Sequence, residues 1–463
     1  MKRHADMLQG SLLSGIIRYT VPIMLTSVLQ LLFNAADLVI VGQYCGSICV
    51  GAVSATGTIT NLIITLFLGL SVGCSVAVAH GIGSKDDTEV HRIVHTAIPT
   101  AIIGGIILSV IGVLFSEDFL QMMNTPENVL PLATVYMQLY FCGMVFSMIY
   151  NFAAAILRAA GDTKSPFYFL TIAGIINVGL NILFVTVLKM DVDGVALATI
   201  ISQGVSAILC IFALMKRTDA CKLYLKKIRF YKKQFLKMLQ IGLPAGIQSS
   251  LFSISNVFIQ SSVNSFGSEA ILSGNGAAGN IEGFSYVIMN SFHQAAVNYI
   301  GTNKGAHQFD RIKKAYGICI GYVMLFGLGT GLLIWFFGKE LLSIYLTDSP
   351  EAITYGLIRF NYVALPYFLC GLMDVTTGAL RGLGSSFAPM MISVLGVCGI
   401  RIVWIYTIFQ IPKYHTLDCL FFSYPISWLI TVVCQVVALK IIFDKKSKAD
   451  KVWLQNSTLG AEA

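Results

Sequence analysis

The amino-acid sequence predicts an all-α polytopic membrane protein, with twelve transmembrane helices in two pseudo-symmetric six-helix bundles. The first observation is composition. Of the 463 residues, 56% are hydrophobic and 12% are charged, which is about half the charged fraction of a soluble domain. The second is that apolar blocks of about 20 or more residues, long enough to cross a bilayer core, recur along the chain. The third is that the two halves of the chain match each other in sequence.

Hydropathy predicts six spans in each half of the chain. The first six lie at about residues 14–42, 47–79, 92–115, 129–158, 164–188 and 194–215. The second six lie at about residues 235–266, 270–302, 311–338, 353–382, 386–410 and 416–443. The basic start of the chain resembles a signal peptide, but the apolar stretch after it continues to about residue 41. We therefore expect an uncleaved first span.

Basic segments separate the bundles and predict the orientation of the chain. The stretch MKRTDACKLYLKKIRFYKKQFLK has nine Lys or Arg against one Asp, and the chain end DKKSKADK is also basic. Because short basic loops remain cytoplasmic, both termini and this stretch are expected on the cytoplasmic side of the plasma membrane. Orientation explains the net charge of +8, so no nucleic-acid partner is expected. The predicted domains are an N-terminal bundle, a basic linker, a C-terminal bundle and a tail: 1–215, 216–234, 235–443 and 444–463.

An internal repeat relates the two halves. TVPIMLTSVLQLLFNAADLVI aligns without a gap with GLPAGIQSSLFSISNVFIQSS, which pairs Pro22 with Pro244. In the same register Asp37 faces Ile259, so the shared architecture does not require an acid at this position. Six spans per half give both halves the same topology. Such repeats are typical of carriers, whose substrate sites lie between the repeats near the membrane midplane.

Asp37 is the most informative residue because it lies inside a long apolar block, where a charge costs several kcal/mol. Thr26, Gln30, Asn34 and Asp37 lie within about 80° of one another on one face of the first span. They form a polar stripe on an otherwise apolar helix. Gln30 and Asn34 are expected to line a substrate cavity.

The fifth and sixth spans carry polar residues that we expect to meet this stripe, because polar groups inside a membrane need partners. Asn177 and Asn181 lie one turn apart on the fifth span, and the sixth span supplies Thr199, Ser202 and Gln203. These residues would add amide and hydroxyl oxygens to the carboxylate.

Two functions of Asp37 follow, and a structural role remains as the alternative. Burial disfavours the charged form of a carboxyl group, which would let Asp37 exchange a proton near physiological pH. Alternatively, Asp37 and neutral oxygens would hold Na⁺. The structural alternative is that Asp37 only ties helices together. Interhelical hydrogen bonding is equally consistent with Asn177 and Asn181, and a bond within its own helix is favoured for Thr199.

No other metal site or cofactor is predicted. The eleven Cys residues are scattered, mostly inside apolar blocks, and no CxxC pair occurs. This is neither a disulfide framework nor a zinc pattern. We expect small apolar packing roles for nearly all of them.

The second half carries its own buried polar residues. Glu282, Tyr286, Met289 and His293 lie within about 60° on one face of the eighth span. An acid with aromatic and Met neighbours suits a hydrophobic cation, and the alternative is a core face with a polar anchor.

Two further buried charges lie in this half. Asp374 and Arg401 are on adjacent spans at similar depths, and we predict a structural ion pair in preference to a transport role. Arg359 is expected to lie nearer the outer face and to extend its guanidinium towards the interface.

Several motifs occur in order along the chain: the first-span ADLVIVG, the motifs AILRAAGDTKSP and GALRGLGSS, the Asn pair of the fifth span, and GVALAT. With these motifs and the duplicated twelve-span layout, the chain resembles the multidrug and toxic compound extrusion (MATE) transporters over essentially its whole length. This resemblance implies membership of the multidrug/oligosaccharidyl-lipid/polysaccharide exporter superfamily and two six-helix bundles around a V-shaped cavity. It also implies export of organic cations or amphipathic drugs by alternating access, in exchange for H⁺ or Na⁺.

The resemblance also implies roles for individual residues. Asp37 stands where prokaryotic members carry an essential acid, Asn177 matches their fifth-span Asn, and Thr199 matches the sixth-span Thr of the cation site. Asn181 is a departure, since many members have Asp at this position, and it leaves one carboxylate and an open choice of coupling ion. The seventh span, LPAGIQSSLFSIS, lacks the functional Glu of one branch of the family.

Other functions are less consistent with the sequence. A lipid-linked oligosaccharide flippase of the same superfamily would need several basic residues in its cavity, and Arg401 is the lone candidate. A membrane-embedded enzyme would need a motif such as HExxH or GxSxG, and neither occurs. A receptor or channel would not explain a parallel repeat with an acid in one half. We therefore predict a non-enzymatic transporter that acts as a monomer among membrane lipids, with small organic cations or drugs as partners.

Overall fold

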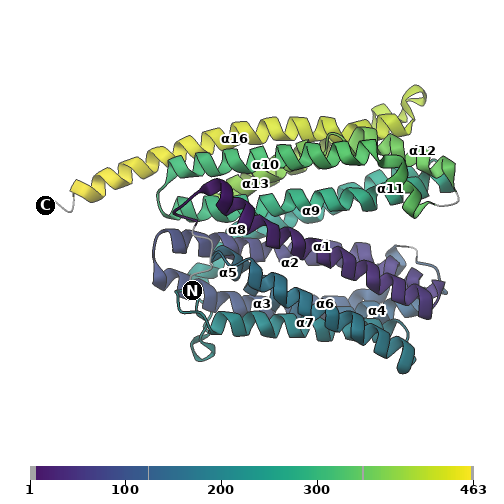
Figure 1. Cartoon of the computed structure of the whole chain (residues 1–463), viewed down its shortest axis with the longest axis horizontal. Coiled ribbons are helices and arrows are strands. Elements are labelled where there is room, and N and C mark those ends of the chain that lie inside the picture. The colour runs from purple at the N-terminus through teal and green to yellow at the C-terminus, as the bar shows by residue number, and fades with distance from the viewer. Residues whose placement is uncertain (1–6, 124, 347–348, 460–463) are drawn as a thin grey trace. The chain divides into compact units, whose positions relative to one another are not determined.

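The computed structural model describes residues 7–123, 125–346 and 349–459, and it contains helices and no strand in these residues (Figure 1). The helices of the first half alternate with short connections. They are α1 (Leu12–Tyr44), α2 (Ser47–Gly83), α3 (Asp87–Met122), α4 (Leu130–Cys142), α5 (Met144–Ala159), α6 (Lys164–Ile182), the π-helical η1 (Leu183–Val187), α7 (Val192–Met215) and η2 (Leu225–Lys227).

The second half contains a similar series of long helices, with more short elements between them. Its elements are α8 (Lys232–Asn264), α9 (Glu269–Gly305), α10 (Phe309–Phe336), α11 (Gly338–Tyr345), α12 (Pro350–Arg359), the π-helical η3 (Phe360–Ala364), α13 (Tyr367–Gly382), α14 (Phe387–Ser393), the π-helical η4 (Val394–Gly399), α15 (Ile400–Tyr406), η5 (Ile408–Gln410), η6 (Pro412–Tyr414) and α16 (Leu417–Leu459).

The helices confirm the predicted polytopic all-α fold. In the described residues, eight helices are long and apolar enough to cross a membrane, and two bent helix pairs bring the number to ten. The long helices α8 and α9, with 33 and 37 residues, are less apolar and complete the twelve. Their lower hydropathy comes from Ser, Asn and Gln residues along both helices.

The repeat extends to details of helix shape. The fourth span consists of α4 and α5, which bend by 45° at Gly143, and the tenth consists of α12 to α13, which bend by 41° beside Pro366. Glycine and proline at these breaks weaken the helical hydrogen-bond ladder. The corresponding spans of both halves are therefore bent, although a different residue type marks each break.

The chain packs into two compact units. One is Val21–Ser250, and the other joins Met7–Thr20 to the residues from Leu251 onward. These units differ from the halves predicted from the sequence in one respect, because the beginnings of α1 and α8 each pack in the unit formed mainly by the opposite half. The predicted borders at the basic linker remain predictions.

Glycines explain how the beginning of α8 packs in the first unit. A Cβ atom on Gly69 of α2 would lie 2.2 Å from the backbone nitrogen of Gly246, and one on Gly73 would lie 2.0 Å from the carbonyl oxygen of Met238. The two helix backbones are therefore close enough that only glycine fits between them. This is the small-residue packing expected where helices associate inside a membrane.

The linker is fixed to the first unit by polar contacts at the start of α3. Glu89 accepts hydrogen bonds from Gln234, at 2.7 Å, and from Lys237. The backbone N–H of Tyr224 donates to Nε2 of His95 at 3.1 Å. These contacts join the beginning of α8 to the beginning of α3.

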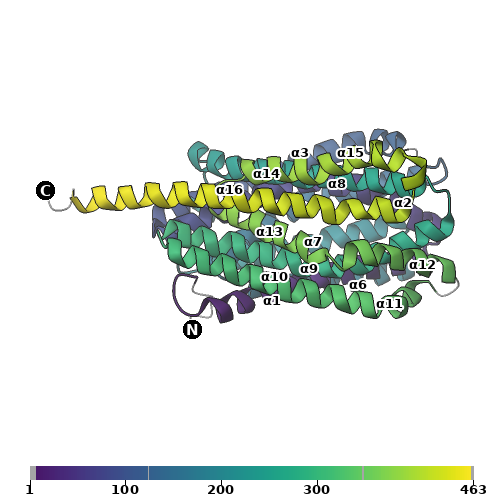
Figure 2. The same ribbon diagram turned by 90° about the horizontal axis from the view of Figure 1, so that it is seen from above.

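In the second unit, α16 is 43 residues long. Its C-terminal part extends beyond the ends of α10 and α13, as both views show (Figures 1 and 2). This extension contains the basic segment DKKSKADK, so the segment predicted as a tail continues the last helix.

We predict that Gly73→Ala lowers the midpoint of thermal unfolding of the purified protein. The added methyl group must push α2 away from α8, and overpacking of this kind costs about 1–3 kcal/mol. Gly57→Ala, in the same helix, is the matched control because nothing lies within 4 Å of the position that its methyl group would occupy. An unchanged midpoint for Gly73→Ala would contradict the close packing of α2 and α8.

Candidate functional site

The first unit joins polar side chains of α1, α6 and α7 in a hydrogen-bonded series. Nδ2 of Asn181 donates to Oδ1 of Asp37 at 2.6 Å and lies 3.4 Å from Oδ1 of Asn177. Nδ2 of Asn177 lies 3.4 Å from Oγ1 of Thr199, whose hydroxyl donates to the carbonyl of Val195 at 3.0 Å. The four residues expected to couple a cation are therefore neighbours in space. We call them the Asp37 cluster.

The electrostatic setting of the cluster is unusual. Asn181 is fully buried, Asn177 is 5% exposed, and Asp37 is half-buried. In the part of the chain that the structure describes, no Lys, Arg or His forms an ion pair with Asp37. Oδ1 of Asn181 is buried and has no hydrogen-bond partner among the described residues. The cluster thus combines an uncompensated acid with an amide oxygen that can accept a further bond.

Close packing of α1 on α6 brings Asp37 and Asn181 together. A Cβ atom on Gly174 would lie 1.8 Å from the ring of Phe33, so this glycine makes room for an aromatic side chain of α1. Phe33 lies one turn before Asp37. The π-helical η1 begins two residues after Asn181, and π-turns within helices frequently mark functional sites.

The remaining residues of the first-span stripe lie outside the hydrogen-bonded series. Thr26 is buried, and its hydroxyl donates to the carbonyl of Pro22 in its own helix at 2.7 Å. Gln30 and Asn34 are exposed. Both therefore remain available to a ligand, as a cavity role would require.

Two tyrosines that the sequence did not single out lie near the acid. Tyr136 and Tyr140 of α4 stack with ring centroids 6.1 Å apart, and the carboxylate of Asp37 is an electrostatic neighbour of both hydroxyl groups. Their spacing of four residues places both on one face of α4. That spacing is also typical of ordinary core residues, so it carried no functional signal in the sequence.

In the second unit, Glu282 is paired with Arg359. The guanidinium donates to both carboxylate oxygens at distances of 2.7–3.1 Å and also to Oδ1 of Asn275 at 2.6 Å. The side chains of Arg359 and Glu282 are 13% and 5% exposed. The expectation that Arg359 extends to the interface is wrong, and Glu282 is not a free acid for a cationic substrate. Sequence alone did not pair them because they are distant in the chain.

The other residues on the predicted face of α9 are mostly packed inside the unit. Met289 is fully buried, and its sulfur would lie 2.5 Å from a Cβ atom on Gly371. Nδ1 of His293 lies 2.6 Å from the backbone carbonyl of Asp374. Of the four residues on this face, Tyr286 is the exposed one, at 45%. The predicted ligand surface therefore reduces to Tyr286, because α10, α12 and α13 surround most of α9.

The predicted ion pair between Asp374 and Arg401 does not form. Nε of Arg401 donates to Oγ of Ser427 at 3.1 Å, and its guanidinium carbon lies 3.9 Å from the centroid of the Tyr424 ring. Oδ2 of Asp374 is buried without a hydrogen-bond partner in the described part of the chain, and its charged neighbour is Arg381. The sequence predicted similar membrane depths for Asp374 and Arg401, but it could not predict the directions in which their side chains point.

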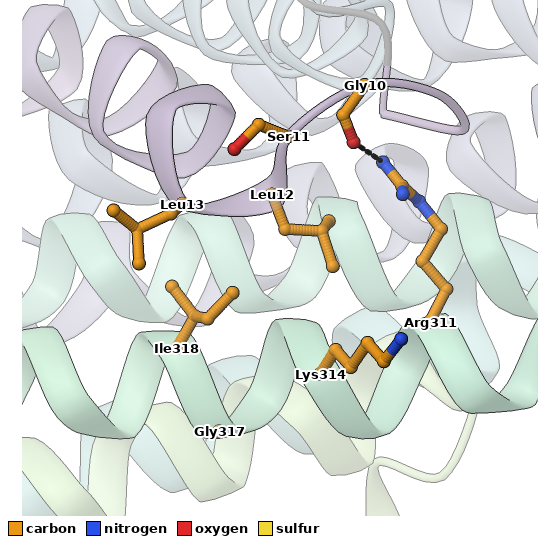
Figure 3. Close-up of a pocket in the computed structure, with 8 residues that line it drawn as sticks. All are labelled: Gly10, Ser11, Leu12, Leu13, Arg311, Lys314, Gly317 and Ile318. Atoms are coloured by element: carbon orange, nitrogen blue, oxygen red, sulfur yellow. Dashed lines mark hydrogen bonds between the residues drawn. The ribbon is translucent and has the colours of Figure 1, made fainter.

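A separate pocket of about 510 Å³ lies in the second unit, between the beginning of α1 and α10 (Figure 3). Arg311 donates to the backbone carbonyls of Gln9 and Gly10 at 3.0 and 3.2 Å, and Lys314 is exposed at its edge. No residue of the Asp37 cluster lines this pocket. Arg311 thus anchors the segment before α1.

Comparison with known families identifies the chain. The MatE family model matches residues 22–183 and again residues 244–407. The two matches begin at Pro22 and Pro244, the prolines paired by the internal repeat. The chain belongs to the MatE family.

Two relatives of this chain have names that concern drug resistance. The chain is 28% identical over 397 residues to the probable multidrug resistance protein YpnP of Bacillus subtilis (strain 168), covering 86% of this chain and 88% of the relative. It is 27% identical over 437 residues to the probable multidrug resistance protein YoeA of the same strain, covering 92% and 93%.

A solved structure shares the MatE fold. It is described as the outward-facing conformation of a multidrug resistance MATE family transporter of the MOP superfamily. The match has a TM-score of 0.89 at 20% identity and covers 97% of this chain and 99% of that chain. At this level of identity the similarity establishes the fold.

We predict that Arg359→Met strongly destabilises the protein, because it leaves the Glu282 carboxylate buried without compensation. Removal of one partner from a buried ion pair costs about 3–5 kcal/mol. The double variant Glu282→Gln/Arg359→Met should recover much of this loss. The measurement is the free energy or midpoint of unfolding, with Glu340→Gln as the control at an exposed acid. Equal stability of Arg359→Met and wild type would refute the pairing.

Proposed function

We propose that this protein is a secondary active efflux transporter that exports organic cations or amphipathic drugs by antiport with H⁺ or Na⁺. The observation that carries the proposal is the uncompensated carboxylate of Asp37, held by Asn181 inside a membrane helix bundle. Glu282, a comparable buried acid of the second unit, is already neutralised by Arg359. Asp37 is thus better suited to reversible neutralisation by an ion.

A carboxylate in this environment favours binding of a small cation. Isolated charge is unfavourable in a low-dielectric interior, and either a proton or Na⁺ would relieve it. Na⁺ prefers oxygen ligands, and Asp37, the unpartnered Oδ1 of Asn181 and the hydroxyl of Thr199 could supply them. A proton requires the carboxylate alone. Both coupling ions are therefore compatible with the cluster.

Ion binding can drive transport by changing the population of two conformations. If the neutral cluster favours one arrangement of α1, the ion shifts the equilibrium between inward-open and outward-open states. A bias of about 5.5 kcal/mol converts a 1:99 population into 99:1. Pro22 interrupts the hydrogen-bond ladder of α1, which makes it the proposed bending point. The ion and the substrate need not touch each other.

The aromatic pair on α4 supports an organic cation as substrate. Tyr136 and Tyr140 lie near the acid, and the faces of tyrosine rings attract cations. The exposed side chains of Gln30 and Asn34 add hydrogen-bonding groups. The names of two Bacillus relatives, probable multidrug resistance proteins, support drugs as substrates.

The alternatives receive less support. A flippase for a lipid-linked oligosaccharide would favour basic residues around the ligand, whereas the Asp37 cluster is acidic and amide-rich. A catalytic role has less support because the sequence contains neither an HExxH nor a GxSxG motif. We infer a multi-pass transporter of the plasma membrane with both termini in the cytoplasm and a monomeric functional unit.

We predict that Asp37→Asn abolishes gradient-driven efflux while the protein remains folded. The amide can replace the carboxylate in shape but cannot be neutralised by H⁺ or Na⁺. The assay is ethidium transport in proteoliposomes, with the pH and Na⁺ gradients varied independently. Loss of efflux under both gradients supports the coupling role, and the gradient that drives the wild type identifies the ion.

The matched control is Asp118→Asn, which changes an exposed acid at the end of α3 and should leave efflux unchanged. Thermal unfolding checks that Asp37→Asn is folded. Full efflux by folded Asp37→Asn would rule out the coupling role of this residue.

A further inference from the structure

Three potential metal ligands meet at one end of the first unit. The Sγ atoms of Cys45 and Cys49 and a carboxylate oxygen of Asp191 all lie within 4.8 Å of one another. Cys45 is half-buried, Cys49 is buried and Asp191 is exposed, and both cysteines are free thiols. We call these residues the Cys45 site. It is distinct from the Asp37 cluster, and neither thiol serves in the proposed transport mechanism.

The turn between α1 and α2 brings the two thiols together. The N–H of Cys45 still donates to the carbonyl of Val41 at 2.9 Å, which continues the last turn of α1. Gly46 then adopts φ +85°, a left-handed conformation that glycine reaches without steric cost. The chain reverses, and α2 begins at once, so that Cys49 lies in its first turn. The sequence Cys45-x-x-x-Cys49 is therefore folded into a thiol pair.

The third ligand comes from the beginning of α7. Asp191 precedes the first residue of α7, but its side chain makes no capping hydrogen bond to that helix. Its carboxylate lies beside the thiols instead, and it is an electrostatic neighbour of both of them. Asp193 adds a second negative neighbour for Cys45. Two carboxylates beside two cysteine sulfur atoms create a negative potential that attracts a cation.

We propose that Cys45, Cys49 and Asp191 bind a thiophilic divalent cation of the Zn²⁺ or Cd²⁺ class. Zinc binds thiolate sulfur at about 2.3 Å and carboxylate oxygen at about 2.0–2.2 Å. The three ligand atoms lie within 4.8 Å of one another, so one ion placed between them can approach all three. Soft sulfur ligands select such ions over Mg²⁺ or Ca²⁺. Three protein ligands leave the fourth tetrahedral position for water. Binding releases the thiol protons to solvent.

A metal at this site would connect the α1–α2 turn to the beginning of α7. Asp37 lies about two helical turns before Cys45 on α1, and Thr199 lies about two turns after Asp191 on α7. The bound ion would therefore cross-link two helices that also carry the Asp37 cluster. Metal binding would therefore stabilise the packing of α1, α2 and α7 at this end of the first unit.

The test measures metal binding to the full-length, reduced protein in detergent and does not depend on transport. Equilibrium dialysis against Zn²⁺ should give one bound ion per chain, and Cd²⁺ titration should produce a thiolate-to-metal charge-transfer band. Both signals should be lost in Cys45→Ser/Cys49→Ser. Asp191→Asn removes a direct ligand and should weaken binding at least tenfold, because loss of even an outer-shell partner typically costs about 10–100-fold.

Two further variants test whether the bound metal requires Cys45 and Cys49 specifically. Cys142→Ser/Cys434→Ser removes two exposed thiols elsewhere and should retain the bound ion and the Cd²⁺ band. If the double variant does not fold, Cys45→Ser alone provides the test, because it leaves the buried Cys49 unchanged. This single variant should also lose the Cd²⁺ band. Zn²⁺ should also raise the unfolding midpoint of the wild type but not of Cys45→Ser, because a ligand that binds the native state stabilises it.

Equal metal binding by wild type and Cys45→Ser would overturn the proposal. So would mapping of a Cys45–Cys49 disulfide in the isolated protein together with no Zn²⁺ binding after its reduction. Loss of efflux activity in any of these variants has no bearing on either result.

Discussion

The hydrogen bond from Asn181 to Asp37 is the interaction on which the proposed function depends. It fixes a carboxylate of α1 against α6 without adding positive charge, so the acid is positioned but not neutralised. A charged partner would remove the reason for an ion to bind, and complete loss of the donor would leave the carboxylate without a defined place. Gly174 and Phe33 supply the close helix packing that makes this geometry possible.

The second unit contains a buried acid, Glu282, that differs from Asp37 because it forms an ion pair. Glu282 is neutralised by Arg359, and this ion pair joins α9 to α12. In the repeat alignment Asp37 faces Ile259, which is 2% exposed and belongs to the apolar core of the second unit. The duplicated fold therefore carries a titratable position in one half and apolar packing at the equivalent position of the other. This difference at the equivalent position is the reason for proposing ion coupling at Asp37.

The sequence predicted the parts of this arrangement that follow from helical periodicity. Asp37 and Asn181 were expected to meet because each interrupts an apolar helix and needs a partner. Side-chain pairing across helices depends on rotation and depth, which hydropathy does not determine, so Arg401 was assigned the wrong partner. The site at Cys45 was missed for a related reason, since its ligands lie at helix ends that only the folded chain brings together.

Infrared difference spectroscopy of the purified protein would decide whether Asp37 is reversibly neutralised, because it reports the state of the carboxyl group itself. We predict an Asp37 signal that changes reversibly with pH or Na⁺ and is missing from the spectrum of Asp37→Asn. A carboxylate signal at Asp37 that stays constant across both titrations, in a protein that still transports, would contradict ion coupling at this residue.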